Sequence, residues 1–296
     1  MERIAGAPIS WGVCEVPGWG RQLSPERVLH EMARVGLRAT ELGPTGYLPI
    51  EPGRLRDLLA SYDIRLVGGF VPVMLHREDR LTDELVQAAK SADLLAAGGA
   101  DVLVLAAAIG DGYDRSAKLD PKEWKTLIHG LDRIIEIGAE RALSVALHPH
   151  HGTVIEDDNQ LQRVLESSPV SVCIDTGHLM IGGADPGEVA RVARNRVSHV
   201  HLKDVASDLA EQVRTGRVGY RDAVRRELYR PLGAGDVDVA GIVRVLEHSG
   251  YRGWYVLEQD AVLETSPEDG AGPMRDAVAS LEFLRRTLET ETSASR

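Results

Sequence analysis

Apolar, β-branched stretches alternate with amphipathic stretches along almost the whole chain. The apolar stretches are typical of buried strands, and the amphipathic ones repeat hydrophobic residues at the spacing of one helix face. The predicted strands lie at residues 4–11, 39–43, 65–74, 101–108, 143–150, 170–178, 197–204 and 253–260. The predicted helices lie at residues 24–36, 51–63, 83–99, 120–142, 157–166, 238–250 and 273–288, with one more that opens at 185–188.

Two helix starts carry clear local signals. Ser24 can cap the helix that follows it, with Pro25 at the first helical position. Asp120 can cap the longest predicted helix, and Glu123, three residues later, completes a capping box. These signals support the boundaries that the hydrophobic pattern indicates.

The alternation predicts a parallel sheet, and eight strand and helix pairs over about 250 to 300 residues are typical of a closed (β/α)8 barrel. The main rival is an open, doubly wound sheet, but no GxGxxG motif follows the first strand. We therefore expect an α/β fold, a (β/α)8 TIM barrel, as a single domain over residues 1–288. A frayed tail is expected at residues 289–296.

One connection is far longer than the others. Residues at about 205–235 separate a predicted strand from the next helix, where about 2 to 6 residues are usual. The segment is either a lid or an interface, or a helical excursion that packs on the barrel rim.

The composition narrows the class of protein. Of the 296 residues, 43% are hydrophobic and 27% are charged, which is typical of a globular domain with a sizeable core. The net charge of −11 disfavours nucleic acid and anionic membranes as partners, and no apolar run is long enough to cross a membrane. Cys14 and Cys173 form no CxxC pair. We expect a cytoplasmic protein that acts on a small molecule.

Polar residues cluster where four predicted strands end. In a barrel of this kind catalysis is located at the carboxyl ends of the strands, where inward-facing positions alternate with outward ones. The alternation predicts that the following side chains face the barrel axis: His148, His150, Asp175, His199, His201, Lys203, Glu258 and Asp260. His199 lies one pleat deeper than His201, and His151 points away from the axis.

A divalent cation would compensate this buried charge and imidazole, which are otherwise costly to bury. A single inward histidine is usually a hydrogen-bonded core residue. Asp175, His201 and Glu258, however, are metal-competent side chains at three consecutive strand ends, and together they favour a metal site. Oxygen and nitrogen ligands suit Mn²⁺, Co²⁺, Zn²⁺, Fe²⁺ or Mg²⁺, with Mg²⁺ the least suited to imidazole. We take Mn²⁺ or Co²⁺ as the expected metal.

Five ordered stretches, "ALHPHHGT", "CIDTGHL", "HVHLKDV", "PLGAGDVD" and "VLEQD", resemble the sugar phosphate isomerase/epimerase superfamily of xylose-isomerase-like barrels. Within it the chain looks most like the inosose (2-keto-myo-inositol) dehydratases. "APISWG", "TELGPTGYLP" and "KEWKTLIHGLDRIIEIG" add to the likeness, which therefore covers nearly the whole chain.

The resemblance implies a divalent metal held by residues of the last four strands. It matches Asp175, His201 and Glu258 to ligands and His178 to a substrate-binding histidine. His148 stands where most isomerases and epimerases of this type have glutamate, and we assign it as the fourth ligand. His150 is then a proton-transfer residue or a residue that supports the ligands.

This histidine changes the expected chemistry, because isomerases and epimerases of this type use two glutamates to remove and return a proton beside a carbonyl. A single base with a histidine acid suits the loss of water from a keto-inositol or related keto-sugar. The expected catalytic residues are Glu258, His150, His178 and Lys203.

Substrate binding is expected to involve Glu41, His178 and residues outside the strand ends. The resemblance implies an arginine where this chain has Ala206, so an arginine of the long connection, Arg214, Arg217 or Arg221, could replace it. Trp11 could form an apolar wall for a sugar ring, with plain core packing as the equal alternative.

Other functions remain open at this stage. An isomerase or epimerase acting on such a substrate is the main alternative to a dehydratase. An abasic-site endonuclease shares this fold, but the acidic charge and the lack of spare metal ligands disfavour it. A non-catalytic subunit is disfavoured by the intact set of metal ligands. Barrels of this kind often form homo-oligomers, and the sequence does not decide this.

Overall fold

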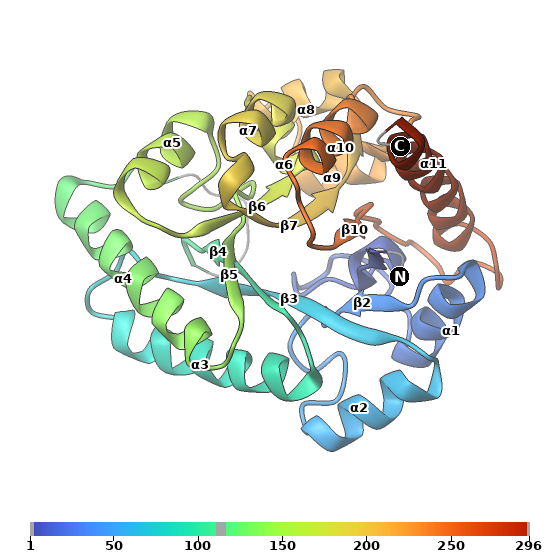
Figure 1. The fold of residues 1–296 in the computed structure, drawn as a ribbon, viewed down its shortest axis with the longest axis horizontal. Helices are drawn as coiled ribbons and strands as arrows, with labels where there is room; N and C mark the ends of the chain where they lie inside the picture. The colour runs from blue at the N-terminus through green and yellow to red at the C-terminus, as the bar shows by residue number, and fades with distance from the viewer. Residues whose placement is uncertain (1–2, 111–116, 295–296) are drawn as a thin grey trace.

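The computed structural model describes residues 3–110 and 117–294. Within them, parallel strands close into a barrel in the order β1-β10-β7-β6-β5-β4-β3-β2, and helices surround it (Figure 1). The barrel strands are β1 (Ile4–Gly6), β2 (Ala39–Glu41), β3 (Arg65–Val73), β4 (Val102–Ala107), β5 (Ser144–Leu147), β6 (Ser171–Asp175), β7 (Val197–Leu202) and β10 (Tyr255–Leu257). The predicted (β/α)8 barrel is confirmed.

The helices follow the strands in the predicted alternation. They are α1 (Pro25–Val35), α2 (Pro52–Ser61), α3 (Leu81–Gly98), α4 (Pro121–Ala139), α5 (Asp158–Ser167), α6 (Thr176–Ile181), α7 (Pro186–Val192), α8 (Ser207–Arg214), α9 (Tyr220–Arg225), α10 (Val239–His248) and α11 (Pro273–Ala294). Ser24 caps α1 through its side chain, and Asp120 and Glu123 form the predicted capping box of α4. Two short 3-10 helices, Pro8–Trp11 and Arg194–Arg196, complete these elements.

The barrel interior and its outer shell have different side chains. Small residues fill the interior in two clusters, one of Ala5, Ala7, Ala39, Val67 and Val256 and one of Val102, Val104, Ala146 and Cys173. Larger residues of the alternate positions, such as Tyr255 and Leu257, pack outward with the helices. The strand alternation thus sorts side chains as the sequence predicts, and it directs the polar residues at the strand ends to the barrel axis.

Several strands are shorter than predicted, and the elements differ from the prediction in three further ways. The first strand ends at Gly6, because Pro8 has no N–H for a strand ladder and starts a 3-10 helix. Helix α6 was not expected, and Asp175 caps it. Helix α11 runs beyond the predicted end at residue 288 to Ala294, since no glycine or proline interrupts that stretch. Residues 295–296 of the predicted tail lie outside the described residues.

The long connection is a helical excursion with a short ribbon of its own. It contains α8 and α9, and β8 (Asp204–Val205) pairs antiparallel with β9 (Tyr229–Arg230). The buried carboxylate of Asp204 holds the end of the connection against its beginning. It accepts hydrogen bonds of 2.8 to 3.0 Å from the N–H groups of Val205, Gly233, Gly235 and Val237. Four main-chain donors are therefore satisfied by one side chain.

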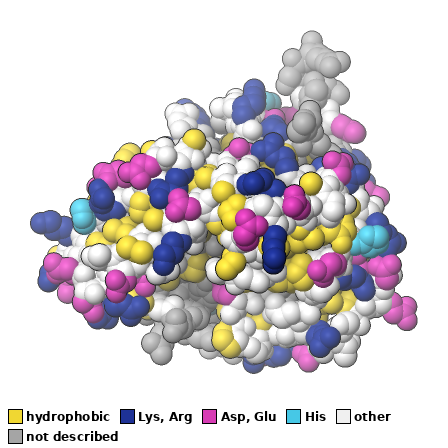
Figure 2. All heavy atoms as spheres, turned by 90° about the horizontal axis from the view of Figure 1, so that it is seen from below, with side chains coloured by type: hydrophobic (Ala, Val, Ile, Leu, Met, Phe, Trp, Pro, Cys, Tyr) yellow, Lys and Arg dark blue, Asp and Glu magenta, His cyan; other side chains and the backbone are white. Residues whose placement is uncertain are grey.

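The surface is mixed in character. Acidic and basic side chains are interspersed over the face shown in Figure 2, with small groups of hydrophobic side chains between them. No helix of the described residues is both long and apolar enough to span a bilayer.

The hydrogen bonds of Asp204 should contribute measurably to the stability of the fold. We expect Asp204→Asn to lower the free energy of unfolding by about 1 to 3 kcal/mol, because an amide NH2 would replace an oxygen that accepts two main-chain N–H groups. Urea denaturation followed by circular dichroism measures this. Asp236→Asn is the matched control, since Asp236 is exposed and accepts hydrogen bonds from the main chain and the hydroxyl of Ser207. Equal urea midpoints for the two variants would contradict the role of Asp204.

Candidate active site

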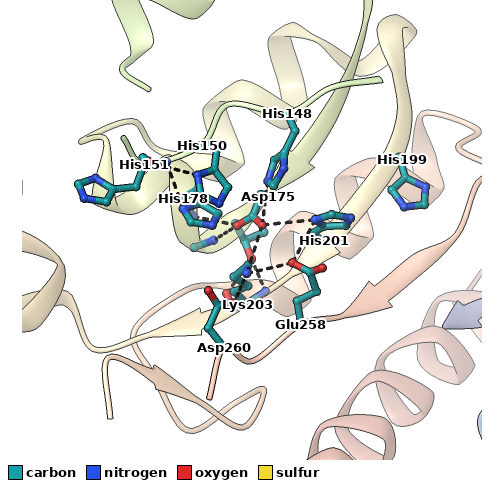
Figure 3. A network of polar contacts seen from close by, with 12 residues as sticks. His148, His150, His151, Asp175, His178, His199, His201, Lys203, Glu258 and Asp260 are labelled. Atoms are coloured by element: carbon teal, nitrogen blue, oxygen red, sulfur yellow. Dashed lines mark hydrogen bonds and ion pairs between the residues drawn. The ribbon is translucent and has the colours of Figure 1, made fainter. Parts of the chain in front are cut away.

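Side chains from four neighbouring strands meet at the carboxyl end of the barrel (Figure 3). The strand register places Asp175 of β6 beside His201 of β7, and β10 lies on the other side of β7. The four side chains predicted as metal ligands are each at most 8% exposed: His148, Asp175, His201 and Glu258. The structure thus brings the predicted ligand residues together in one buried group.

Asp175 uses its two carboxylate oxygens differently. Oδ1 accepts hydrogen bonds from two main-chain N–H groups and so caps α6. Oδ2 faces the site, 3.1 Å from Nε2 of His148, 3.5 Å from Nδ1 of His201 and 3.8 Å from Nζ of Lys203. Burial raises the pKa of Asp175, but the charge of Lys203 leaves it well below its ordinary value. Asp175 is therefore a carboxylate with one oxygen aimed at the site.

The carboxylate of Glu41, on β2, contacts Nε2 of His201. Oε1 of Glu41 lies 3.0 Å from Nε2 of His201 and 2.7 Å from Nε2 of His199. Burial raises the pKa of Glu41, but the charge of His201 and the hydrogen bonds leave it well below its ordinary value. Because a carboxylate only accepts hydrogen bonds, Nε2 of His201 donates, and Nδ1 is left to face Glu258 at 3.2 Å.

The ammonium of Lys203 lies between buried carboxylates. Nζ lies 2.9 Å from Oε2 of Glu258 and donates a hydrogen bond to Oδ1 of Asp260. The other oxygen of Asp260 accepts a hydrogen bond of 2.6 Å from the hydroxyl of Tyr220. Burial lowers the pKa of Lys203, but Asp260 and Glu258 raise it well above its ordinary value. Lys203 is therefore charged and offsets part of the negative charge of the site.

Two further imidazoles lie beside the ligand group. The ring centroids of His150 and His178 are 3.8 Å apart, and both rings line the cavity described below. Burial, together with neighbouring imidazoles, holds the pKa of each well below its ordinary value. Both are therefore neutral near pH 7, and a neutral imidazole has one donor and one acceptor nitrogen.

The donor set fits a divalent cation. One imidazole nitrogen and two carboxylate oxygens, from His201, Asp175 and Glu258, lie within 4.8 Å of one another. Nδ1 of His201 is buried and has no hydrogen-bond partner among the described residues, although it faces both carboxylates. Because Glu41 accepts from Nε2, Nδ1 is the nitrogen positioned to coordinate a cation, which would take the place of a proton there, and a carboxylate partner orients metal-binding histidines in other proteins in the same way. His148 and Asp175 form an adjoining group with His178.

A cavity of about 210 Å³ opens beside these residues. Its polar wall includes Glu41, His148, His201, Lys203 and Glu258. Its apolar wall consists of side chains from the first loop, the loop after β2, β3 and α9, among them Val16, Trp19, Pro44, Phe70 and Tyr220. A hydroxylated ring could lie against the aromatic wall and present its oxygens to the polar one.

The structure separates the residues predicted for substrate binding. Glu41 and His178 line the cavity, whereas Trp11, Arg214 and Arg217 do not. Trp11 is 1% exposed and donates a hydrogen bond of 2.8 Å to Glu31, so the geometry favours its core-packing alternative. Both arginines are exposed and pair with Glu211 on the surface of the connection.

The residue that the connection does contribute is Tyr220, which the sequence analysis missed. Its ring lies 6.0 Å from that of Trp19 and 5.1 Å from that of His151, and its hydroxyl also meets that of Tyr229 at 2.8 Å. An aromatic residue at the start of a short helix in an otherwise charged segment was the available signal.

Comparisons with known proteins agree with this geometry. A family model described as xylose isomerase-like TIM barrel matches residues 29–287. The inosose dehydratase of Geobacillus kaustophilus (strain HTA426) is 33% identical over 270 residues, which cover 87% of this chain and 87% of that protein. The rhizopine catabolism protein MocC of Rhizobium meliloti is 31% identical over 267 residues, which cover 87% of this chain and 81% of that protein.

Solved structures show the same fold. The crystal structure of the IolI protein with a binding zinc atom has a TM-score of 0.74 at 12% identity, and the match covers 98% of this chain and 99% of that one. The resemblance predicted from the sequence motifs is confirmed by the family model and by the relatives above 30% identity. The chain belongs to the xylose isomerase-like TIM barrel family.

Proposed function

We propose that this chain is a divalent-metal-dependent lyase that removes water from a keto-inositol or a related keto-sugar. The observation that carries the proposal is the similarity to inosose dehydratase over 87% of the chain. The site is consistent with it, since a buried cluster of metal-competent side chains adjoins a cavity with polar and aromatic walls.

His148, Asp175, His201 and Glu258 are the proposed metal ligands. Imidazole combined with carboxylate suits Mn²⁺ or Co²⁺, with Zn²⁺ and Fe²⁺ as alternatives and Mg²⁺ the least suited. When bound, the ion supplies polarisation of the substrate carbonyl, which makes the neighbouring C–H bond more acidic.

Two bonds of the substrate break in this dehydration. They are the C–H bond next to the ketone and the C–O bond of the next hydroxyl, so that a proton and a hydroxide leave as water. Glu258 and His150 are the candidate bases, since a carboxylate and a neutral imidazole accept protons. His178 and Lys203 are the candidate donors to substrate oxygens. Glu41, Trp19 and Tyr220 complete the proposed substrate site.

An isomerase or epimerase acting on a similar substrate is the alternative. Its usual chemistry needs two carboxylates, one on each side of the substrate. In this chain a histidine, His148, stands at one of these places, and it contacts Asp175. This arrangement supports dehydration. A cytoplasmic location and a homo-oligomeric state belong to the same proposal.

The first experiment tests the reaction. We expect the protein with added Mn²⁺ or Co²⁺ to convert 2-keto-myo-inositol to a product that has lost water and absorbs in the ultraviolet, and treatment with a chelator to abolish this. Absorbance and mass spectrometry in deuterated water measure it. Loss of water should fall by at least about 100-fold in Glu258→Gln and His148→Ala, because each removes a metal ligand or a proton-transfer group.

His129→Gln is the control, because His129 is exposed on α4. Uptake of deuterium without loss of water would replace the lyase by an epimerase. Full activity after metal removal would refute the metal requirement.

A second experiment tests the metal centre without any substrate. We expect Glu41→Gln to weaken Mn²⁺ or Zn²⁺ binding about 10- to 100-fold, because a neutral amide oxygen accepts the Nε2–H of His201 more weakly than a carboxylate and so makes Nδ1 a poorer ligand. Competition with a fluorescent chelator measures the affinity, with His129→Gln as control. Unchanged metal affinity combined with a raised KM would assign Glu41 to the substrate.

A further inference from the structure

In the turn that follows β5, the main-chain oxygen and the main-chain nitrogen of His151 each contact one of the two neighbouring imidazoles, His150 and His178. Nδ1 of His150 lies 2.6 Å from the main-chain oxygen of His151. Nδ1 of His178 lies 3.3 Å from the main-chain nitrogen of His151, which donates to it. The main chain of His151 therefore contacts Nδ1 of each ring. Its oxygen accepts from His150, and its N–H donates to His178.

These contacts fix the two rings in opposite tautomers. A carbonyl oxygen only accepts, so Nδ1 of His150 carries the proton and Nε2 has the lone pair. A main-chain N–H only donates, so Nδ1 of His178 has the lone pair and Nε2 carries the proton. Because a protonated nitrogen cannot coordinate, Nε2 of His178 is a donor to a ligand and not a metal ligand.

The turn is held firmly enough to impose this choice. Thr153 returns two hydrogen bonds to the main-chain oxygen of His150, from its N–H at 3.2 Å and from its hydroxyl at 2.8 Å. The N–H of His150 donates to Ile155 at 3.0 Å. Gly152 has a φ of 72°, which side chains other than glycine rarely adopt. The side chain of His151 is anchored away from the cavity by Glu156.

One donor in this group has no acceptor among the residues that the structure describes. Nε2 of His178 is buried and has no hydrogen-bond partner among the described residues, and His178 is 1% exposed and lines the cavity. A buried donor left without an acceptor is costly, so its position at the cavity wall points to an oxygen atom of a bound ligand.

We propose that the main chain of His151 divides the work between the two imidazoles, with His150 as the proton acceptor and His178 as a hydrogen-bond donor that keeps its proton. The assignment rests on the proposed dehydration. Nε2 of His150 takes the proton from the carbon next to the ketone, and the electron pair of that C–H bond forms a carbon–carbon double bond as the neighbouring C–O bond breaks. The departing hydroxide receives the proton from His150 and leaves as water, so His150 returns to its starting state.

The tautomers can be measured without substrate. Long-range proton–nitrogen NMR of the full chain with ¹⁵N-labelled histidine, with and without Zn²⁺, distinguishes a protonated Nδ1 from a protonated Nε2. His150→Gln and His178→Gln identify the signals of the two rings. We expect the Nδ1–H form for His150 and the Nε2–H form for His178. Either ring in the opposite tautomer would overturn the proposal.

Turnover of 2-keto-myo-inositol tests the division of work. Glutamine can donate a hydrogen bond from a place close to that of Nε2, but it cannot take up a proton. We therefore expect His150→Gln to lower kcat about 10²- to 10⁴-fold, whereas His178→Gln should mainly raise KM and lower kcat less than about 10-fold. His178→Leu, which cannot donate, should lose more than His178→Gln.

The outcomes separate this proposal from the proposed function. A wild-type protein without dehydratase activity would refute the proposed function and the assigned proton transfer. The NMR experiment would still test the two tautomers, because it needs no substrate. In an active protein, equal losses of kcat in His150→Gln and His178→Gln, or an active His150→Gln, would overturn the division of work.

Discussion

The site depends on the compensation of buried negative charge at the mouth of the barrel. Asp175, Glu258 and Asp260 are all at most 8% exposed, and the ammonium of Lys203 contacts each of them. With His201 and its partner Glu41 included, two cations face four carboxylates, which leaves the group negative and favours a divalent cation beside Asp175 and Glu258. The hydroxyl of Tyr220 completes the set by donating to Asp260. The long connection is thus tied to the barrel by the same charges that form the site.

Much of this arrangement could be predicted from the sequence because a strand leaves little freedom. Alternation along β6, β7 and β10 directs Asp175, His201 and Glu258 to the barrel axis once the strands are recognised. Capping signals at Ser24 and Asp120 similarly fixed two helix starts, and both are confirmed. These features depend on a few consecutive residues, and local sequence therefore contains the information.

Contacts between distant segments could not be predicted in the same way. Glu41 and His201 are 160 residues apart, and only closure of the barrel places β2 within reach of β7. Tyr220 lies in the long connection, outside the strands, so the strand alternation did not indicate that its side chain would turn toward the cavity. Trp11 was ambiguous for the same reason, and its partner Glu31 belongs to α1.

The histidines of the turn after β5 show why residue type alone does not define a role. His148, His150 and His151 have the same ring, but their rings contact different partners: the carboxylate of Asp175, a main-chain oxygen and the side chain of Glu156. The partner decides which nitrogen carries the proton and therefore whether the other can bind a metal, accept a proton or neither. The spacing of the three histidines predicts a reactive site, and the main chain between them sets which nitrogen of His150 carries the proton.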